Sequence, residues 1–291
     1  MPSEAPSSLA SATMKPALIV SDVHVGAVYG ATEAAFLDFV RFAAKEAGAL
    51  VLNGDLFDVG PLDATWRASE HQPVLRGLAE AVASGLTVTF IGGNRDPVEW
   101  CAETLAGLGV EVRDDPTRLV IAGREALIAH GDGARHGAGR PYRKPYPLLR
   151  SRVLVALARG LGLAPALHRF LSERSPTRPR VAAASRGEST GPKRRAPAIE
   201  AWARSELARD PRLELVIAGH SHVPALVEVS PGRYYVNAGD WISHHTYAVV
   251  PPDAGPPEVR FWPSHSPVDW DDLHDAEVPA SESRLEGGVR R

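Results

Sequence analysis

The sequence predicts an α/β fold in which helices cover the faces of a layered β-sheet. Two observations indicate this class. Through the first 130 residues, short apolar runs alternate with amphipathic helical patterns, which is the order expected of β-α-β units. After residue 222 the pattern changes to short β-rich runs separated by tight-turn residues, which indicates antiparallel strands. With 291 residues, 44% of them hydrophobic and 23% charged, the chain is long enough to bury a large core.

Five apolar runs predict buried strands, and each of them ends in a polar loop. They span residues 17–20, 49–53, 86–91, 125–130 and 213–219. Between the first two runs, the segment 31–48 places Phe36, Phe39 and Val40 on one face, which predicts an amphipathic helix. The segment 71–85 has a similar pattern and predicts a second helix. The later β-rich runs predict strands near residues 225–229, 234–240, 246–250 and 258–262.

Charge separates one segment from the rest of the chain. Between Gly133 and Asp210 there are 17 Lys and Arg but 5 Asp and Glu, a balance of +12, whereas the whole chain carries −3. A basic module of this size favours an anionic partner, although a solvated surface without a specific partner stays an alternative. The predicted organisation is a leader (1–15), a core (16–134 and 206–265), a basic helical insertion (135–205) and a flexible tail (266–291).

Composition also bounds the setting of the protein. The single cysteine, Cys101, excludes an internal disulfide framework and is typical of a reducing compartment. The first residues do not resemble a secretory signal, because they include an acid and no long apolar run. No segment has the roughly 18 uncharged apolar residues of a membrane span. We therefore expect a cytoplasmic protein.

Polar residues cluster at the end of each of the five predicted core strands. The clusters are Asp22 and His24 in SDVH, Asp55 and Asp58 in NGDLFD, Asn94 and Asp96 in GGNRD, His130 and Asp132 in AHGD, and His220 and His222 in AGHSH. In an α/β sheet the carboxyl ends of the strands meet at one edge, where binding sites form. Mixed His, Asp and Asn ligands suit Mn²⁺, Zn²⁺ or Fe, and the candidates outnumber what one ion uses. The sequence therefore predicts two divalent metal ions that share a carboxylate and activate a water molecule.

Four of the clusters contain a glycine. Gly54, Gly93, Gly131 and Gly219 lie where the chain leaves a strand. Because glycine adopts backbone conformations that other residues avoid, each of the four is predicted to allow a sharp turn.

The order of these clusters resembles the motifs of the calcineurin-like metallophosphoesterases. That family has D-x-H, G-D-x-x-D, G-N-H-D, a later histidine and G-H-x-H, and this sequence resembles it over residues 16–250, with G-N-R-D as the third motif. The resemblance implies an αββα sandwich with a two-metal site and a helical insertion. The first ion would be held by Asp22, His24, Asp55 and His222, and the second by Asp55, Asn94, His130 and His220. Asp58 and Asp96 would orient these ligands, although a role as helix or turn caps is an alternative.

Arg95 stands where many members of that family have histidine. A histidine can protonate a leaving alkoxide, whereas the guanidinium of arginine keeps its proton near neutrality. Arginine can instead bind phosphate oxygens in a bidentate manner and stabilise charge as it develops. A phosphate monoester leaves readily as an anion, so Arg95 predicts cleavage of a phosphoanhydride. We expect Arg95, Asp55 and His130 to be catalytic, with a surface-pointing Arg95 as the alternative.

Within that family, G-N-R-D followed by HGD and a basic helical insertion resembles the UDP-2,3-diacylglucosamine hydrolases of lipid A synthesis. The resemblance implies Mn²⁺, attack at the α-phosphorus of the UDP group, and release of UMP and 2,3-diacylglucosamine 1-phosphate. It also implies that the insertion is a lid for acyl chains, whereas a plain pair of packing helices is the alternative. We expect the arginines of the insertion to meet phosphates or an anionic membrane surface, which would place the protein at the periphery of the inner membrane. The expected substrate contacts are Arg95, Tyr142, Arg143, Leu149, Val153 and Leu157.

Two other functions stay open from the sequence. The basic insertion could bind nucleic acid through its phosphates, which would suit a phosphodiesterase or nuclease on the same scaffold. Arg95 and the few aromatic residues available for base stacking speak against that function. The second alternative is a non-catalytic interaction module. The complete ligand set speaks against it, because buried polar groups without partners cost stability.

Overall fold

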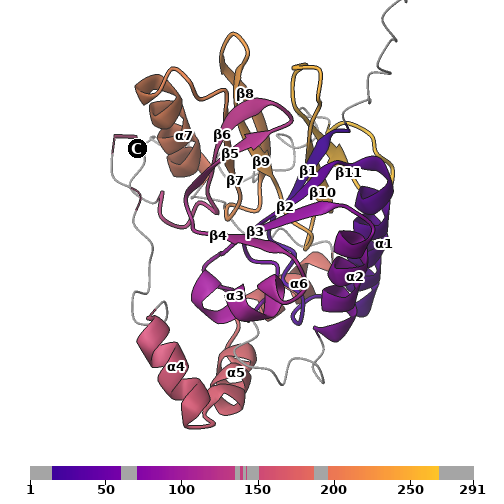
Figure 1. The fold of residues 1–291 in the computed structure, drawn as a ribbon, viewed down its shortest axis with the longest axis vertical. Helices are drawn as coiled ribbons and strands as arrows, with labels where there is room; N and C mark the ends of the chain where they lie inside the picture. The colour runs from indigo at the N-terminus through magenta and orange to yellow at the C-terminus, as the bar shows by residue number, and fades with distance from the viewer. Residues whose placement is uncertain are drawn as a thin grey trace, which may run out of the picture.

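The computed structural model describes residues 15–59, 71–134, 138–139, 142, 151–186 and 196–268. Within these residues the chain forms two β-sheets flanked by helices (Figure 1). The first sheet has the strand order β11-β10-β1-β2-β3-β4, and the second has the order β5-β6-β7-β9-β8. Two predicted substrate contacts, Arg143 and Leu149, lie outside the described residues, as do nearly all of the predicted leader and most of the predicted tail.

The first sheet is parallel where strands alternate with helices. Its parallel strands are β1 (Ala17–Val20), β2 (Ala49–Asn53), β3 (Thr87–Ile91) and β4 (Glu111–Arg113). The helices that connect them are α1 (Gly30–Glu46), α2 (Gln72–Ala83) and α3 (Val98–Ala106). At the β1 edge, β10 (Thr246–Val250) and β11 (Glu258–Phe261) add antiparallel strands. The sequence does not predict β4, because its segment Glu-Val-Arg forms no apolar run.

The second sheet is built from later segments of the chain. Its strands are β5 (Thr117–Ile121), β6 (Arg124–Ile128), β7 (Leu215–Ala218), β8 (Pro224–Ser230) and β9 (Arg233–Ala238). The central strands β6, β7 and β9 are parallel, whereas β5 and β8 are antiparallel edge strands. The helix α7 (Ala196–Arg209) leads into β7 and packs on this sheet.

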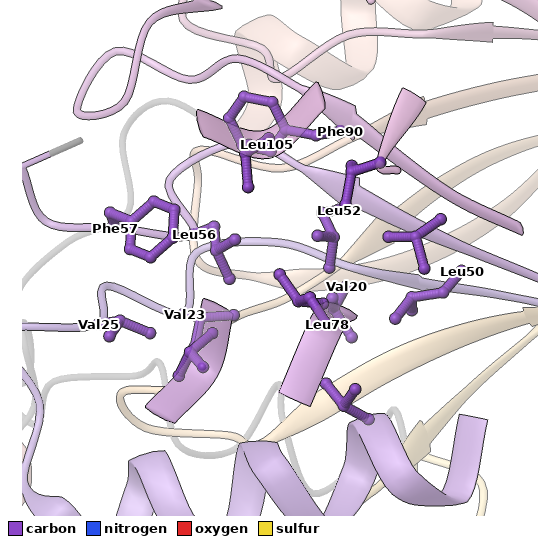
Figure 2. Packing of buried hydrophobic residues seen from close by; sticks show 14 of the residues in the cluster. Val20, Val23, Val25, Leu50, Leu52, Leu56, Phe57, Leu78, Phe90 and Leu105 are labelled. Atoms are coloured by element: carbon purple, nitrogen blue, oxygen red, sulfur yellow. The ribbon is translucent and has the colours of Figure 1, made fainter. Parts of the chain in front are cut away.

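Alternate residues of each strand divide the core into layers, since successive side chains of a strand point to opposite faces. In β1, Val20 packs toward the helices α1–α3, whereas Ile19 packs toward the second sheet. Figure 2 shows the first layer, in which Val20 lies among side chains of β2, β3 and Leu78 of α2. On the far side of the second sheet, Trp202 of α7 packs with Val216 of β7. This order of helix, sheet, sheet and helix confirms the predicted α/β class and its αββα sandwich.

Within the described residues, the predicted insertion contains three short helices, α4 (Arg152–Gly160), α5 (Ala164–Glu173) and α6 (Thr177–Ala184). It also includes the first part of α7, which packs on the second sheet and so belongs with the core. The helices α4 and α5 project from one end of the molecule (Figure 1), and most of the large exposed hydrophobic side chains belong to them and their connection. By contrast, Thr177 and Val181 of α6 are buried. In the described part of the chain, no single helix has the length and apolar character of a membrane span. In this part of the chain, only α4 and α5 taken together have that length and apolar character, and the pair is bent by 113° at the break between them.

Candidate metal centre

The five predicted clusters follow strands that end at the same edge of the sandwich. Asp22 and His24 follow β1, the Asp55 cluster follows β2, the Asn94 cluster follows β3, His130 follows β6, and the His220 cluster follows β7. Backbone hydrogen bonds tie these loops together. The N–H of Asp22 donates to Gly54 O (3.1 Å), and the N–H of Gly219 donates to His130 O (2.8 Å). Across the two sheets, the N–H of His220 donates to Asp22 Oδ2 (2.8 Å). The loops of both sheets therefore form one framework.

Many candidate ligands have an unusual backbone conformation. The residues with positive φ include Asp22 (57°), His24 (56°), Asp55 (52°), His220 (65°) and His222 (61°). For a residue with a side chain, this left-handed region costs about 1–2 kcal/mol. Such strain persists only where the surrounding structure determines the backbone, and it clusters at functional sites. The loops therefore hold these side chains at a cost in stability.

The four glycines of the clusters meet two different requirements, and Gly54 meets both, because a Cβ atom there would also overlap the ring of His130. Gly54 (φ 78°) and Gly131 (φ 114°) adopt the left-handed conformation, as a sharp turn requires. Gly93 and Gly219 do not, so the predicted conformational role is wrong for them. Each lies instead where a Cβ atom would overlap a side chain next to the centre, Asp55 in the first case and Ser21 in the second. Glycine at these two positions allows close approach of the loops.

Asp22, His24 and His222 form the first group that could hold an ion, with one ligand atom of each within 4.8 Å of the others. Asp22 Oδ1 lies 3.8 Å from His24 Nε2 and 3.4 Å from His222 Nε2. The two imidazole rings are stacked, with centroids 5.2 Å apart. Asp22 Oδ2 is engaged by the hydroxyl of Ser21 and the N–H of His220. These contacts leave Oδ1 facing the two imidazoles.

Asp55, His130 and His220 form the second group, again within 4.8 Å. Asp55 Oδ1 lies 3.5 Å from His130 Nε2, and Asp55 Oδ2 lies 3.8 Å from His24 Nε2 of the first group. One carboxylate thus faces both groups, which is the arrangement expected of a bridging ligand. His130 Nδ1 lies 3.1 Å from the carbonyl oxygen of Asn53, so its Nε2 is the nitrogen that points into the centre.

The open hydrogen-bonding atoms of these residues fit a pair of cations. Among the described residues, the buried atoms without a hydrogen-bond partner include Asp22 Oδ1, His24 Nε2, Asn94 Oδ1 and His130 Nε2. Leaving a buried polar atom unsatisfied costs about 1–3 kcal/mol. Two divalent ions would satisfy all four atoms at once, and nitrogen and oxygen donors are the ligands that Mn²⁺, Zn²⁺ and Fe accept.

The pKa values within the centre reflect the short distances between its charges. Burial raises the pKa of Asp55, but the imidazoles of His130 and His24 outweigh burial and hold that pKa well below its usual range. Burial lowers the pKa of His130, but Asp55 outweighs it and raises that pKa well above its usual value. The Asp55 carboxylate is therefore ionised, and divalent cations would replace the imidazole protons that stabilise it.

Asp96 connects the second and third clusters. Its Oδ1 accepts the N–H groups of Asp55 (2.9 Å) and Gly93 (2.9 Å), and its Oδ2 accepts the N–H of Phe57 (3.0 Å). Burial and the Asp55 carboxylate raise the pKa of Asp96 to about 8. Asp96 thus acts on the backbone that carries Asp55 and has the contacts expected of an orienting carboxylate.

Asp58 lies behind the first group and also touches Arg95. Its Oδ1 is 3.7 Å from His24 Nδ1 and 3.4 Å from Arg95 Nε. Ser175, just before α6 of the insertion, donates a hydrogen bond to the same carboxylate. Burial raises the pKa of Asp58, but His24, Arg95 and Ser175 outweigh it and lower the pKa to about 2. An ionised Asp58 therefore joins a candidate ligand, Arg95 and the insertion.

The predicted substrate contacts lie in different surroundings. Arg95 does not point to the surface, because its side chain is 20% exposed and lies against Asp58. The hydroxyl of Tyr142 lies between two buried carboxylates, 2.9 Å from Asp115 Oδ2 and 3.1 Å from Asp132 Oδ1. Val153 and Leu157 are 68% and 54% exposed on α4. The structure thus places Arg95 at the centre, Tyr142 behind the His130 loop, and the α4 residues on the outer surface.

Several residues that support the centre have no prediction from the sequence. Asn53 accepts the hydroxyl of Ser21 on its carbonyl oxygen (3.0 Å) and donates its side-chain amide to Ala129 O (3.0 Å). Asp115 accepts the N–H of His130 (2.9 Å), and Asp240 lies 3.0 Å from His222 Nδ1. One sequence signal does exist for Asp240: it follows an apolar β-run and a glycine, the pattern that precedes Asp55.

Comparison with known proteins relates this arrangement to a family. The family model of calcineurin-like phosphoesterases matches residues 15–224. A UDP-2,3-diacylglucosamine hydrolase of Ralstonia nicotianae is 31% identical over 244 residues, which cover 79% of this chain and 85% of that protein. A protein of the same name from Ectopseudomonas mendocina is 30% identical, and the match covers 77% of this chain and 89% of that protein. Another from Klebsiella pneumoniae subsp. pneumoniae is 28% identical, and the match covers 81% of this chain and 95% of that protein. The chain is a hydrolase that belongs to the calcineurin-like phosphoesterase family.

Proposed function

We propose that this hydrolase cleaves the pyrophosphate of UDP-2,3-diacylglucosamine into UMP and 2,3-diacylglucosamine 1-phosphate. The observation that carries the proposal is the state of Arg95. Its Nε and Nη2 are buried atoms that make no hydrogen bond among the described residues, although Nε lies 3.4 Å from the carboxylate of Asp58. Buried donors without a hydrogen bond cost free energy until an acceptor reaches them, and the guanidinium fork matches two phosphate oxygens. The names of the three relatives support the same substrate.

Calcineurin-like phosphoesterases use dimetal centres, and we propose Mn²⁺ as the native metal. Bound at the two groups, the ions would activate a water molecule and neutralise charge on the phosphate. The proposed ligands of the first ion are Asp22, His24, Asp55 and His222, and those of the second are Asp55, Asn94, His130 and His220. Arg95 binds the phosphoryl oxygens as charge develops, and it has no proton to give. The leaving group is then a phosphate monoester, which departs as an anion.

The insertion would select the lipid part of the substrate. The exposed apolar side chains of α4 and α5, Val153 and Leu157 among them, would receive the acyl chains. Arg152, Arg169 and Arg174 lie on the same two helices or directly after them. Arginines beside an apolar helix face suit the anionic headgroups of a membrane surface. We therefore propose that the protein works in the cytoplasm at the inner membrane.

The reaction can be tested by ³¹P NMR of the Mn²⁺-loaded protein in H₂¹⁸O. UDP-2,3-diacylglucosamine is the substrate, and bis-p-nitrophenyl phosphate is the diester control. We expect ¹⁸O-labelled UMP and little cleavage of the diester. If the diester is cleaved and the UDP-lipid is untouched, the phosphodiesterase alternative replaces this proposal.

Arg95 is tested against a matched surface arginine. Arg113 on β4 is 49% exposed and pairs only with Glu111 among the described residues. We expect Arg95→Ala to lose about 10²–10³-fold in kcat, as removal of a transition-state donor does. Arg113→Ala should keep wild-type turnover, and both variants should bind metal as the wild type does. Equal turnover of Arg95→Ala and wild type would refute the role given to Arg95.

A further inference from the structure

Asp240 lies directly behind His222, the histidine that ends the G-H-x-H motif. It follows β9, and its side chain is 2% exposed. Asp240 Oδ2 lies 3.0 Å from His222 Nδ1. A histidine that donates one ring N–H to a carboxylate is held in one tautomer, with the other nitrogen free to bind a metal. In His222 that other nitrogen, Nε2, faces Asp22 Oδ1 at 3.4 Å.

The second oxygen of Asp240 is already occupied. Asp240 Oδ1 accepts the backbone N–H groups of Ser243 (3.1 Å) and His244 (3.0 Å). The same oxygen lies 2.8 Å from His244 Nδ1. With three donors on Oδ1, the carboxylate cannot rotate without losing hydrogen bonds. Its orientation toward His222 is therefore fixed by contacts that do not involve the metal centre.

The turn that carries Asp240 also holds a second candidate ligand. The N–H of Trp241 donates to Asp22 O (3.1 Å), and the N–H of Thr246 donates to Asp240 O (3.2 Å). One turn thus binds both the backbone of Asp22 and the ring of His222. The second ligand group has a different support, since His130 Nδ1 faces the carbonyl oxygen of Asn53.

We propose that Asp240 is a positioning residue for the first ion. It keeps the ring proton of His222 on Nδ1, so that the lone pair of Nε2 points to the ion shared with Asp22 and His24. This inference rests on the proposed dimetal centre. It predicts that a change at Asp240 affects one ion and leaves the ion of Asp55, His130 and His220 in place.

Asparagine at position 240 would reverse the tautomer of His222. An amide offers one acceptor oxygen and one donor group, where a carboxylate offers two acceptors. The amide oxygen would take the side where three donors face Oδ1, which turns the NH₂ group toward His222 Nδ1. Nδ1 of His222 then has to accept a hydrogen bond from this NH₂ group, so the ring proton moves to Nε2. A proton on Nε2 excludes the ion. Asp240→Asn therefore keeps the size of the side chain and removes one ligand.

The test compares wild type, Asp240→Asn and His244→Gln, each prepared without metal and then equilibrated with Mn²⁺ at one free concentration. His244→Gln is the matched control, because it removes a partner of the same carboxylate and leaves the contact to His222. Bound Mn²⁺ is counted by mass spectrometry, and electron paramagnetic resonance distinguishes coupled from isolated ions. We expect a coupled pair in wild type and His244→Gln. We expect an isolated ion in Asp240→Asn, with the other ion bound about 10–100-fold more weakly.

Two results with these variants would overturn the proposal. One is a coupled pair of unchanged affinity in Asp240→Asn. The other is an equal loss in His244→Gln, because the effect would then come from packing of the turn. A wild-type chain that fails to bind a pair of ions would refute the dimetal centre itself, and this inference with it.

A measurement on the wild type does not depend on how well any variant folds. In the Zn²⁺-loaded protein with ¹⁵N-labelled histidine, long-range ¹H–¹⁵N correlation reports which ring nitrogen of His222 carries the proton. The proposal requires the proton on Nδ1. A proton on Nε2 would overturn it.

Discussion

An alanine at position 54 should displace His130 although it changes no candidate ligand. A Cβ atom at Gly54 would lie 2.5 Å from His130 Nδ1 and 2.7 Å from its Cγ. Ordinary van der Waals contact begins at 3.4 Å, so the imidazole has to move by about 0.9 Å, the difference between 3.4 and 2.5 Å. His130 is fully buried, and its Nδ1 lies 3.1 Å from Asn53 O. The movement therefore strains that hydrogen bond and shifts Nε2 relative to Asp55.

The expected loss of stability has two parts. A side chain at φ 78° costs about 1–2 kcal/mol of backbone strain. The overlap with His130 adds about 1–3 kcal/mol, as overpacking of a tight core does. Gly123→Ala is the matched control, because φ there is 83° and a Cβ atom meets nothing within 4 Å. Gly123→Ala should therefore lose only the free energy that comes from backbone strain.

The loss of function should be larger than the loss of stability suggests. Ligand distances in a metal site tolerate about 0.2 Å, so Gly54→Ala should lose the ion of the second group. We expect kcat to fall at least about 10²-fold. Urea unfolding without metal, bound metal by mass spectrometry, and turnover are measured for wild type and both variants. If Gly54→Ala matches Gly123→Ala in unfolding free energy and keeps the wild-type metal content, the reasoning from the distances around His130 is refuted.

Three further predictions concern pH, Tyr142 and the metal. Burial and the neighbouring His168 lower the pKa of His71 from 6.5 to about 4. Because protonation of His71 is disfavoured in the folded state, the unfolding free energy should fall by about 3 kcal/mol as the pH decreases from 6.5 toward 4. In urea unfolding of the metal-free protein, the unfolding free energy of His71→Phe should depend less on pH between 4 and 6.5 than that of the wild type. An equal pH dependence in the two proteins would contradict the role given to His71. Tyr142→Phe should lower the unfolding free energy by about 1–3 kcal/mol, because Asp115 loses its hydroxyl donor; a large rise in KM with unchanged stability would instead favour the substrate contact. Removal of the ions by a chelator should lower the unfolding free energy by about 2.7 kcal/mol for each ion present at 100 times its Kd, and a thermal midpoint that the chelator leaves unchanged would contradict the presence of bound ions.

The proposed lipid-binding role of the insertion can be tested by comparing two exposed apolar residues. Leu157 on α4 is 54% exposed, and Val120 on β5 is 64% exposed on a different part of the molecule. Leu157→Asp should reduce binding to vesicles that contain anionic phospholipid and raise KM for the diacyl substrate. Val120→Asp should do neither. Equal behaviour of the two variants would remove the support for a lipid-binding role of α4.

The candidate ligands could be predicted from the sequence because their signal is local. Asp22, Asp55 and His130 each come directly after a short apolar run, and such a run marks both the strand and the edge where it ends. The contacts that support the ligands are not local. Asp240 and His222 are 18 residues apart, and His130 and Asp115 are 15 apart. No spacing rule connects such pairs, because the relation is created by the pairing of strands and the shape of loops.

The edge strands show the same limit. The segment of β4 has three residues in the pattern Glu-Val-Arg, so only its parallel pairing with β3 makes it a strand. The structural role of each glycine could not be predicted from the sequence either. Gly93 and Gly219 have the same appearance in the sequence as Gly54, but they provide only space, for Asp55 and Ser21, whereas Gly54 provides both a positive φ and space for His130. Whether a glycine serves a turn or a close approach depends on neighbours that the sequence does not place.

The hydrogen bond from His220 to Asp22 joins residues that are 198 positions apart. During synthesis the strands β1–β4 of the first sheet emerge early, and Asp22, His24 and Asp55 emerge with them. The proposed ligand set of the first ion is nevertheless incomplete until residue 222 has left the ribosome. A chain that ends before residue 222 therefore lacks part of the proposed ligand set and has no assembled site. The order of the motifs along the chain thus delays assembly of the site until β1, β2, β3, β6 and β7 have all been made.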